Sequence, residues 1–241
     1  MATPSVDSQT CAVPRAGGEA GDYEDAATVD AADWPVCAAV ADGATESVFA
    51  RAWAERLVRG LVAARATTAE AVREAIAAAQ AEWQASVRER SRDRPWYVTA
   101  KAREGAFATV LGLSLHADGR WRAVSVGDCC LFHVRDEALV RRWPFASADD
   151  FTNRPALVPS RSDRRVPAPE RTNGPWQPGD RFLLATDAVA AWLLRTEGAA
   201  TRSWDPDSFR AAVHRARDDG VLRNDDATLL VLDLASPRAD E

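Results

Sequence analysis

The stretch that decides the fold reads VCAAVADG, from Val36 to Gly43. Its apolar residues form a run of the length typical of a buried β-strand, and the run ends at an aspartate followed by a glycine, a common turn residue. The same arrangement occurs in RAVSVGD, which ends at Asp128, and in RFLLATD, which ends at Asp187. Each stretch therefore predicts a strand with a carboxylate at its C-terminal end.

Acidic pairs also precede strands. Glu24 and Asp25 lie ahead of the first apolar stretch, and Asp225 and Asp226 directly precede ATLLVLDL, residues 227–234. A buried carboxylate is costly to desolvate without a positive partner, so several at strand ends indicate a shared cation. Oxygen ligands alone favour Mg²⁺ or Mn²⁺ over zinc. For any single residue the alternative is that aspartate simply favours turns and helix N-caps.

The remaining pattern is typical of an α+β protein, because paired helices are inserted between hairpin strands without a regular βαβ alternation. Apolar residues at every fourth position predict the first helix, and Thr67 with Glu70 forms a capping-box pattern at the start of the second. In chain order we expect a loose segment over residues 1–20, a strand over 36–42, helices over 44–66 and 67–92, a β-meander over 105–143, a surface loop over 144–180, a strand over 181–187, a helix from Asp205 and a strand over 227–234.

Composition narrows the class of protein. The 241 residues carry 30 basic and 36 acidic side chains, a net charge of −6, which argues against a nucleic-acid partner. The start has no basic stretch followed by an apolar run, and no apolar run is long enough to span a membrane, so we expect no membrane partner and a cytoplasmic location. The four cysteines show no metal-ligand spacing and are expected to be free thiols. Residues 21–241 are expected to form a single domain.

The order of these motifs resembles one known family. The set comprises YEDA (residues 23–26), AVADG (39–43), GAFATVLGL (105–113), VGD (126–128), LLATDA (183–188) and NDDATLLVL (224–232). Together the motifs resemble the metal-dependent serine/threonine protein phosphatases of the 2C type (PPM family). Each motif is short, but their order and their positions at strand ends make the resemblance specific.

The resemblance implies a four-layer α-β-β-α sandwich, with two central antiparallel sheets flanked by helix pairs. It also implies a site for two Mn²⁺ or Mg²⁺ ions, with a third, weaker ion in some members. Carried over to this chain, the resemblance implies that Asp42 would bridge the two ions. The Gly43 carbonyl and Glu24 would complete the coordination of one ion, and Asp187 and Asp225 would hold the other. Asp128 would take part in the third metal site, and Asp25 would hydrogen-bond to a metal-bound water. Asp42 and Asp25 are thus the expected catalytic residues.

The neighbouring acidic residues at the last motif have different expected roles. The family pattern Asp-Asn-x-Thr places the metal carboxylate on Asp225 and leaves Asp226 where an asparagine is usual. Consecutive side chains of an extended segment point to opposite sides, so one of the two should face the cation.

The resemblance implies hydrolysis of phosphoserine and phosphothreonine in proteins by a water that the two ions activate, with no covalent intermediate. The expected partners are a phosphorylated protein and a cognate serine/threonine kinase. Two alternatives remain: a pseudophosphatase that uses the fold as a regulatory or interaction module, and a phosphatase for a small phosphorylated metabolite.

The sequence departs from the family pattern on the substrate side. Ala44 stands where the family often has a histidine, and Ala20 stands where it has a phosphate-binding arginine. Cys129 and Ala188 replace the small residues that usually follow the aspartates of their motifs. Unless Arg15 or an arginine of residues 144–180 substitutes, small phosphoesters should bind weakly.

Overall fold

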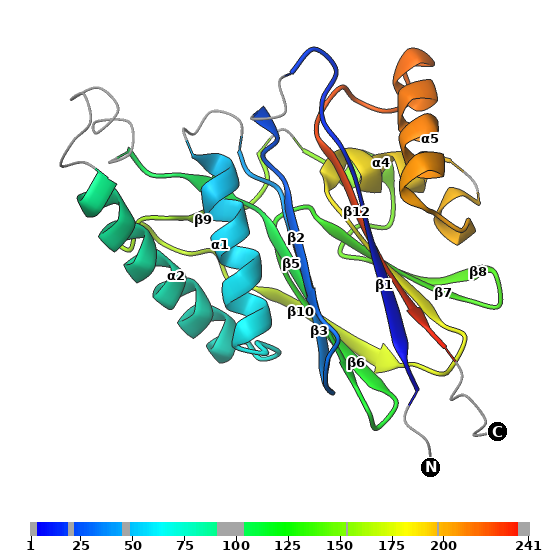
Figure 1. Cartoon of the computed structure of the whole chain (residues 1–241), viewed down its shortest axis with the longest axis horizontal. Coiled ribbons are helices and arrows are strands. Elements are labelled where there is room, and N and C mark those ends of the chain that lie inside the picture. The colour runs from blue at the N-terminus through cyan, green and yellow to red at the C-terminus, as the bar shows by residue number, and fades with distance from the viewer. Residues whose placement is uncertain are drawn as a thin grey trace.

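The computed structural model describes residues 4–18, 22–44, 49–90, 104–152, 154–196 and 198–235. In these ranges two five-stranded antiparallel sheets face each other, and a pair of helices covers the outer side of each sheet (Figure 1). The predicted α-β-β-α sandwich is therefore confirmed.

The two sheets are built from segments far apart in the chain. The first sheet has the order β10-β6-β5-β3-β2 and the second β1-β12-β11-β7-β8. The first comprises β2 Ala26–Asp30, β3 Val36–Ala41, β5 Val110–His116, β6 Arg120–Val126 and β10 Glu170–Pro175. The second comprises β1 Val6–Val13, β7 Cys130–Arg135, β8 Ala138–Trp143, β11 Arg181–Ala185 and β12 Ala227–Leu234. Two short strands, β4 Phe107–Ala108 and β9 Val158–Pro159, pair separately.

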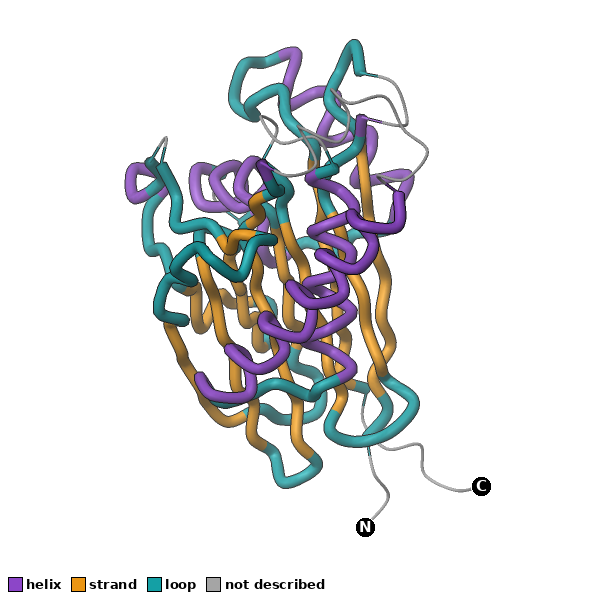
Figure 2. The backbone as a smooth tube through the Cα atoms, turned by 90° about the vertical axis from the view of Figure 1, so that its left-hand side faces the viewer, coloured by secondary structure: helices purple, strands orange, loops and turns teal. Residues whose placement is uncertain are grey.

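The helices pack through apolar stripes. Helices α1, Ala50–Ala63, and α2, Ala69–Arg90, lie across the outer face of the first sheet, as Figure 2 shows. Helices α4, Asp187–Arg195, and α5, Pro206–Asp218, cover the second. The predicted cap of α5 is present, because the Asp205 carboxylate accepts hydrogen bonds from the backbone of Asp207 and Ser208.

Strand β3 shows how the layers are held together. All six of its residues are buried, because successive side chains point to opposite faces and both faces are covered. Cys37, Ala39 and Ala41 pack in the cluster that contains Trp53 and Leu57 of α1. The alternate residues face the second sheet and join the core between the sheets. The strand that carries Asp42 at its end is thus fixed on both sides.

Four details differ from the sequence-based expectations. Residues 1–20 were expected to be loose, but β1 pairs with the full length of β12, from Val6↔Leu234 to Val13↔Ala227. The hairpin of β7 and β8 lies in the second sheet and does not continue the hairpin of β5 and β6, so residues 105–143 are not one meander. The expected loop over 144–180 contains β9 and β10, and β10 pairs with β6 to form an edge strand of the first sheet.

The fourth difference concerns the start of α2. Thr68, rather than the Thr67–Glu70 box, caps this helix, since its hydroxyl accepts a hydrogen bond from the backbone N–H of Ala71 at 3.1 Å. The Thr68 carbonyl accepts the first helical bond, from Val72, at 3.0 Å. The register is therefore one residue later than predicted.

Some expectations concern residues outside the described ranges: Ala20, the end of the second helix at Arg92, and the Thr45–Glu46 part of the family's glycine-rich turn. All four cysteines are free and buried, as expected. Among the described helices, none combines the length and apolar character needed to cross a membrane.

Candidate functional site

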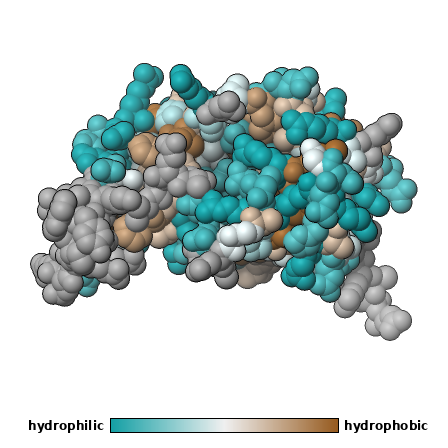
Figure 3. Space-filling model, turned by 90° about the horizontal axis from the view of Figure 1, so that it is seen from above, coloured by the Kyte–Doolittle hydropathy of each residue, from teal (hydrophilic) through white to brown (hydrophobic). Residues whose placement is uncertain are grey.

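Acidic residues from both sheets meet at one end of the sandwich, the upper end in Figure 1. Asp42 follows β3, Asp128 lies between β6 and β7, and Asp187 begins α4 directly after β11. The antiparallel register brings the acidic pair ahead of β2 to the same end, because Ala26 pairs with Ala41. Viewed from above, this end presents hydrophilic residues over much of its centre (Figure 3).

The charges of these carboxylates act on one another. The pKa of Asp42 is raised well above its usual range, first by burial and then by the negative charges of Asp25, Asp187, Asp128 and Asp225. Burial excludes the water that would screen these charges, so their repulsion is strong. The structure therefore brings together five acidic residues that the sequence singled out.

Glu24 and Gly43 lie beside each other at the backbone. A Cβ added to Gly43 would approach the Glu24 carbonyl oxygen to 2.8 Å and Ala50 to 2.9 Å, so only glycine fits between β3 and α1 here. The Glu24 carboxylate forms an ion pair with the Arg15 guanidinium, with 3.6 Å between Oε2 and Nη1. Both predicted ligand positions are thus at the site.

Asp25 joins the two sheets. Its Oδ2 accepts hydrogen bonds from the hydroxyls of Thr186 at 2.9 Å and Thr228 at 2.7 Å, at the ends of two strands of the second sheet. The Tyr23 hydroxyl also hydrogen-bonds to the Thr228 hydroxyl. Burial first, and then the charges of Asp226 and Asp187, raise the pKa of Asp25 to about 8 against the lowering effect of the two hydroxyl donors. A buried carboxylate at this position is costly without a positive partner.

Asp128 is held in a tight turn. Gly127 before it has a φ of +106°, and a Cβ there would lie 2.5 Å from Thr109, so the turn requires glycine. Burial and then the charge of Asp187 raise the pKa of Asp128 to about 7. Its buried Oδ1 has no hydrogen-bond partner among the residues that the structure describes. This oxygen is available to accept a hydrogen bond or to bind a cation.

Asp187 and Asp225 both bind the guanidinium of Arg223. Nη2 of Arg223 donates to Oδ2 of Asp187 at 2.6 Å and to Oδ2 of Asp225 at 2.5 Å. Burial raises the pKa of Asp187, and the nearby Arg223 counteracts this effect while the charge of Asp225 adds to it. The arginine therefore neutralises part of the repulsion between the two carboxylates.

Asp226 has a structural environment. Its side chain is buried, and its two oxygens accept hydrogen bonds from the backbone N–H groups of Arg15 at 2.9 Å and Glu24 at 2.7 Å. Asp225 instead contacts Arg223. The two neighbouring carboxylates thus have separate contacts, with Asp225 toward Asp187 and Asp226 toward the N-terminal segment.

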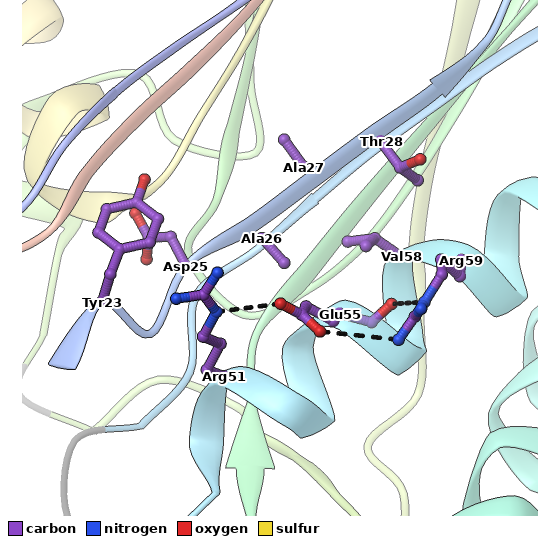
Figure 4. A pocket seen from close by; sticks show the side chains of 9 residues that line it. All are labelled: Tyr23, Asp25, Ala26, Ala27, Thr28, Arg51, Glu55, Val58 and Arg59. Carbon is purple, nitrogen blue, oxygen red and sulfur yellow. Dashed lines mark hydrogen bonds and ion pairs between the residues drawn. The ribbon is translucent and has the colours of Figure 1, made fainter. Parts of the chain in front are cut away.

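A cavity of about 380 Å³ lies between β2 and α1, and one of its lining residues, Asp25, also belongs to the group of clustered carboxylates. Its lining consists of Tyr23, Asp25, Ala26, Ala27 and Thr28 on the strand side and Arg51, Glu55, Val58 and Arg59 on the helix side. Figure 4 shows Glu55 between two arginines, with Arg51 extending toward Tyr23 and Asp25. Nε of Arg51 lies 3.0 Å from Oε1 of Glu55. The cavity therefore has a basic side chain next to the acidic cluster.

Comparison with known proteins agrees with this arrangement. The family model described as protein phosphatase 2C matches residues 22–225, most of the chain. The chain belongs to the protein phosphatase 2C family. The match begins just before Glu24 and ends at Asp225, so it includes every acidic residue discussed above except Asp226.

Solved structures show the same fold as this phosphatase 2C chain. The PPM Ser-Thr phosphatase MsPP from Mycobacterium smegmatis, in complex with cacodylate, is 21% identical with a TM-score of 0.62, covering 98% of this chain and 100% of that one. The catalytic domain of the serine threonine protein phosphatase PstP, in complex with two manganese ions, is 19% identical with a TM-score of 0.61, covering 97% and 100%. PppA, a type VI secretion regulator from Pseudomonas aeruginosa, is 18% identical with a TM-score of 0.59, covering 97% and 100%. No curated protein sequence matches the chain.

The donor set of this family member suits a hard divalent cation in chemistry. Carboxylates gather at this end, burial and neighbouring charges raise the pKa values of Asp42 and Asp128, and the buried Oδ1 of Asp128 lacks a partner within the described ranges. The described residues do not, however, form a ready group of three or more acidic, histidine or cysteine ligands around one point. Arg223 lies between two of the carboxylates instead. The residues therefore fit such an ion chemically, without a preformed cage.

Sequence reasoning missed several residues of this site. Thr186 and Thr228 stand inside the quoted motifs, yet a threonine next to a strand end is too common to indicate a carboxylate partner. Arg223 and Arg51 carried no signal, because an arginine in a turn or on a helix surface is usually solvated.

Proposed function

We propose that this chain hydrolyses phosphoserine and phosphothreonine monoesters in proteins, with Mn²⁺ or Mg²⁺ as cofactor. The observation that carries the proposal is the meeting of carboxylates from both sheets at one end, in a chain of the phosphatase 2C family. The proposed ligands are Glu24, Asp42, the Gly43 carbonyl, Asp187 and Asp225, with Asp128 for a third ion. The proposed substrate is a phosphorylated protein, which a serine/threonine kinase would produce.

The proposed chemistry divides between the ions and the chain. Bound divalent ions would supply Lewis acidity, which lowers the pKa of water and neutralises charge on the phosphoryl oxygens. Asp25 has one oxygen fixed by two threonine hydroxyls, so the carboxylate keeps one orientation. Burial raises the pKa of Asp25 and so favours its protonated form, whereas a nearby cation would favour the ionised form. Asp25 is thus suited to hold or move a proton at Oδ1.

The substrate side of the proposal depends on the cavity beside β2. A phosphate monoester is dianionic near neutral pH, and an acidic cluster alone would repel it. Arg51 lines the cavity and extends toward Asp25, so it can contact the phosphoryl group or the residues beside it. We therefore assign the cavity to the phosphorylated segment of the substrate.

One observation favours the second candidate, a pseudophosphatase with a regulatory role. The described residues hold no preformed ligand group, and Arg223 binds two of the proposed ligands. Such a module would bind partners through the same fold without turnover. It would show no hydrolysis at any Mn²⁺ or Mg²⁺ concentration.

The test is hydrolysis of p-nitrophenyl phosphate and of a phosphoserine peptide, with Mn²⁺, with Mg²⁺ and with a chelator. We expect metal-dependent release of phosphate that Asp42→Asn abolishes. A calorimetric metal titration on the same samples separates the two candidates, because metal binding without turnover supports the pseudophosphatase. Hydrolysis of a phosphorylated metabolite but not of the peptide would redirect the proposal to small substrates.

A further inference from the structure

Arg223 occupies a special position at the acidic end of the sandwich. It lies in the turn before β12, and a single nitrogen, Nη2, contacts Oδ2 of Asp187 at 2.6 Å and Oδ2 of Asp225 at 2.5 Å. These two carboxylates belong to different elements, α4 and the turn before β12. The arginine therefore joins two segments that would otherwise repel each other.

The side chains of the two aspartates are more buried than the side chain of Arg223. The side chain of Asp187 is 14% exposed and that of Asp225 is 31% exposed, whereas the side chain of Arg223 is 60% exposed. Nη2 of the guanidinium thus contacts the site, while more than half of the side-chain surface lies in solvent. Withdrawal of such a side chain uncovers little apolar surface, so it costs little beyond the ion pairs themselves.

The segment around Asp225 is also held by contacts that do not involve the Arg223 side chain. Nη2 of Arg217 donates to the Asp225 carbonyl oxygen at 2.6 Å, and the Asp225 side chain accepts from the backbone N–H of Asp226 at 3.0 Å. Asp187 is likewise fixed as the first residue of α4. The carboxylates therefore keep their places when Arg223 leaves.

We propose that Arg223 is a tethered counter-ion that competes with the divalent cation for Asp187 and Asp225. The inference rests on the proposed function, which assigns these two residues to the metal. An ion held by both Oδ2 atoms from this side would lie about 2.0–2.3 Å from each oxygen, and would overlap with the nitrogen already there. A guanidinium and a divalent ion also repel each other, so the metal binds here when Arg223 withdraws.

The competition has a functional consequence. The arginine stabilises the metal-free chain and raises the metal concentration at which the site fills. Since Arg223 belongs to the chain, its effective concentration at the site is constant, and metal supply alone decides which cation is bound. Phosphatase activity would then follow the free Mn²⁺ or Mg²⁺ concentration over a higher range than the carboxylates alone would set.

The test compares Arg223→Gln with the wild-type chain and with a matched control, Arg210→Gln. Arg210 forms one exposed ion pair, with Asp207 on α5 at 3.0 Å, so both variants remove one positive charge from an ion-paired arginine, and only Arg223→Gln removes it from the proposed metal site. Mn²⁺ affinity is measured by calorimetry, and the melting temperature is measured in chelator. Neither readout requires activity of the metal-loaded enzyme.

We expect Arg223→Gln to bind Mn²⁺ roughly three- to tenfold more tightly, the range expected from loss of two partly exposed ion pairs. It should also lower the melting temperature in chelator, while Arg210→Gln leaves Mn²⁺ affinity unchanged. Unchanged or weaker affinity in Arg223→Gln, beside a wild type that binds Mn²⁺, overturns the competition and leaves the proposed function standing. If neither chain binds Mn²⁺, both proposals fail; metal binding with the expected shift but no hydrolysis rejects the proposed function alone.

Discussion

Asp225 and Asp226 provide the sharpest test of the proposed site, because an exchange of each to asparagine removes the same charge from adjacent positions. Asp226 is buried and accepts two backbone hydrogen bonds, from Arg15 at 2.9 Å and from Glu24 at 2.7 Å. An asparagine side chain has a single acceptor oxygen, so its amide group would face one of these N–H donors. Asp226→Asn should therefore loosen the N-terminal segment and leave the proposed ligand Asp225 in place.

The magnitude follows from the bonds lost. A hydrogen bond to a charged group contributes about 1.5–3 kcal/mol, and Asp226→Asn loses one and weakens the other. For a chain of this size the loss lowers the melting temperature by roughly 3–10 °C. Metal affinity should fall less than in Asp225→Asn, because Asp226→Asn removes no proposed ligand and acts only through the backbone N–H of the proposed ligand Glu24.

Asp225→Asn should show the opposite result. It removes a charge from the proposed ligand set, so Mn²⁺ affinity should fall at least about 100-fold, more than the usual loss for a residue that only orients a ligand. Asp225 is partly exposed, and its ion pair with Arg223 contributes little to stability, so the melting temperature in chelator should stay within about 3 °C.

The assays are thermal unfolding in chelator and calorimetric Mn²⁺ titration, run on both variants and the wild type. The reasoning is refuted if Asp226→Asn loses metal and Asp225→Asn retains it, because the ligand would then be one residue later. Equal stability of Asp226→Asn and the wild type would contradict the role assigned to its two hydrogen bonds.

Three further outcomes are expected. Asp180→Asn should cost about 3 kcal/mol in urea unfolding, because the buried Asp180 carboxylate pairs with Arg135 through two bonds of 2.7 Å. Arg135, the backbone N–H of Gln177 and the ring of His133 hold the pKa of Asp180 below its usual value against burial. The contribution of Asp180 is therefore full above about pH 4 and disappears as pH falls through the lower folded pKa, so the two unfolding curves should converge in acid and stay apart at pH 6. Arg51→Ala should raise KM for a phosphoserine peptide by roughly tenfold with kcat unchanged, and an equal KM would remove Arg51 from the substrate side. Thr186→Val removes a 2.9 Å bond to the buried Asp25 and should cost about 1–3 kcal/mol in urea unfolding, where an unchanged midpoint would argue against that bond.

The sequence predicts the sandwich better at its centre than at its edges. Buried strands such as Val36–Ala41 appear as uninterrupted apolar runs, and they were predicted within a residue. Strand β1 was missed because residues 7–10 are exposed, so the segment has no apolar pattern. Its place depends on backbone hydrogen bonds to β12, and such bonds carry no side-chain signal. The same reason hid β10, an edge strand that contains a glycine and a proline.

The candidate site was predictable through its carboxylates and not through their partners. Aspartates at strand ends show a pattern because the strands themselves are recognisable, and antiparallel pairing brings those ends together. Arg223 is two residues from Asp225, yet nothing in the sequence indicates that it also reaches Asp187, which is distant in the chain. The role of Asp226 was also hidden, because its partners are backbone N–H groups of residues 15 and 24.

The site and the packing of the sheets depend on each other through Asp25. This residue leads into β2 of the first sheet, while its hydroxyl partners Thr186 and Thr228 belong to the ends of β11 and β12 in the second. The burial that contributes most to the raised pKa of Asp25, about 8, also makes its ionised form costly. The two sheets therefore meet at a buried carboxylate whose negative charge is unfavourable. A cation bound among the carboxylates, either the guanidinium of Arg223 or a divalent metal ion, would offset part of their negative charge. The end of the sandwich that is suited to bind a cation is therefore also an end at which Asp25 links the two sheets through Thr186 and Thr228.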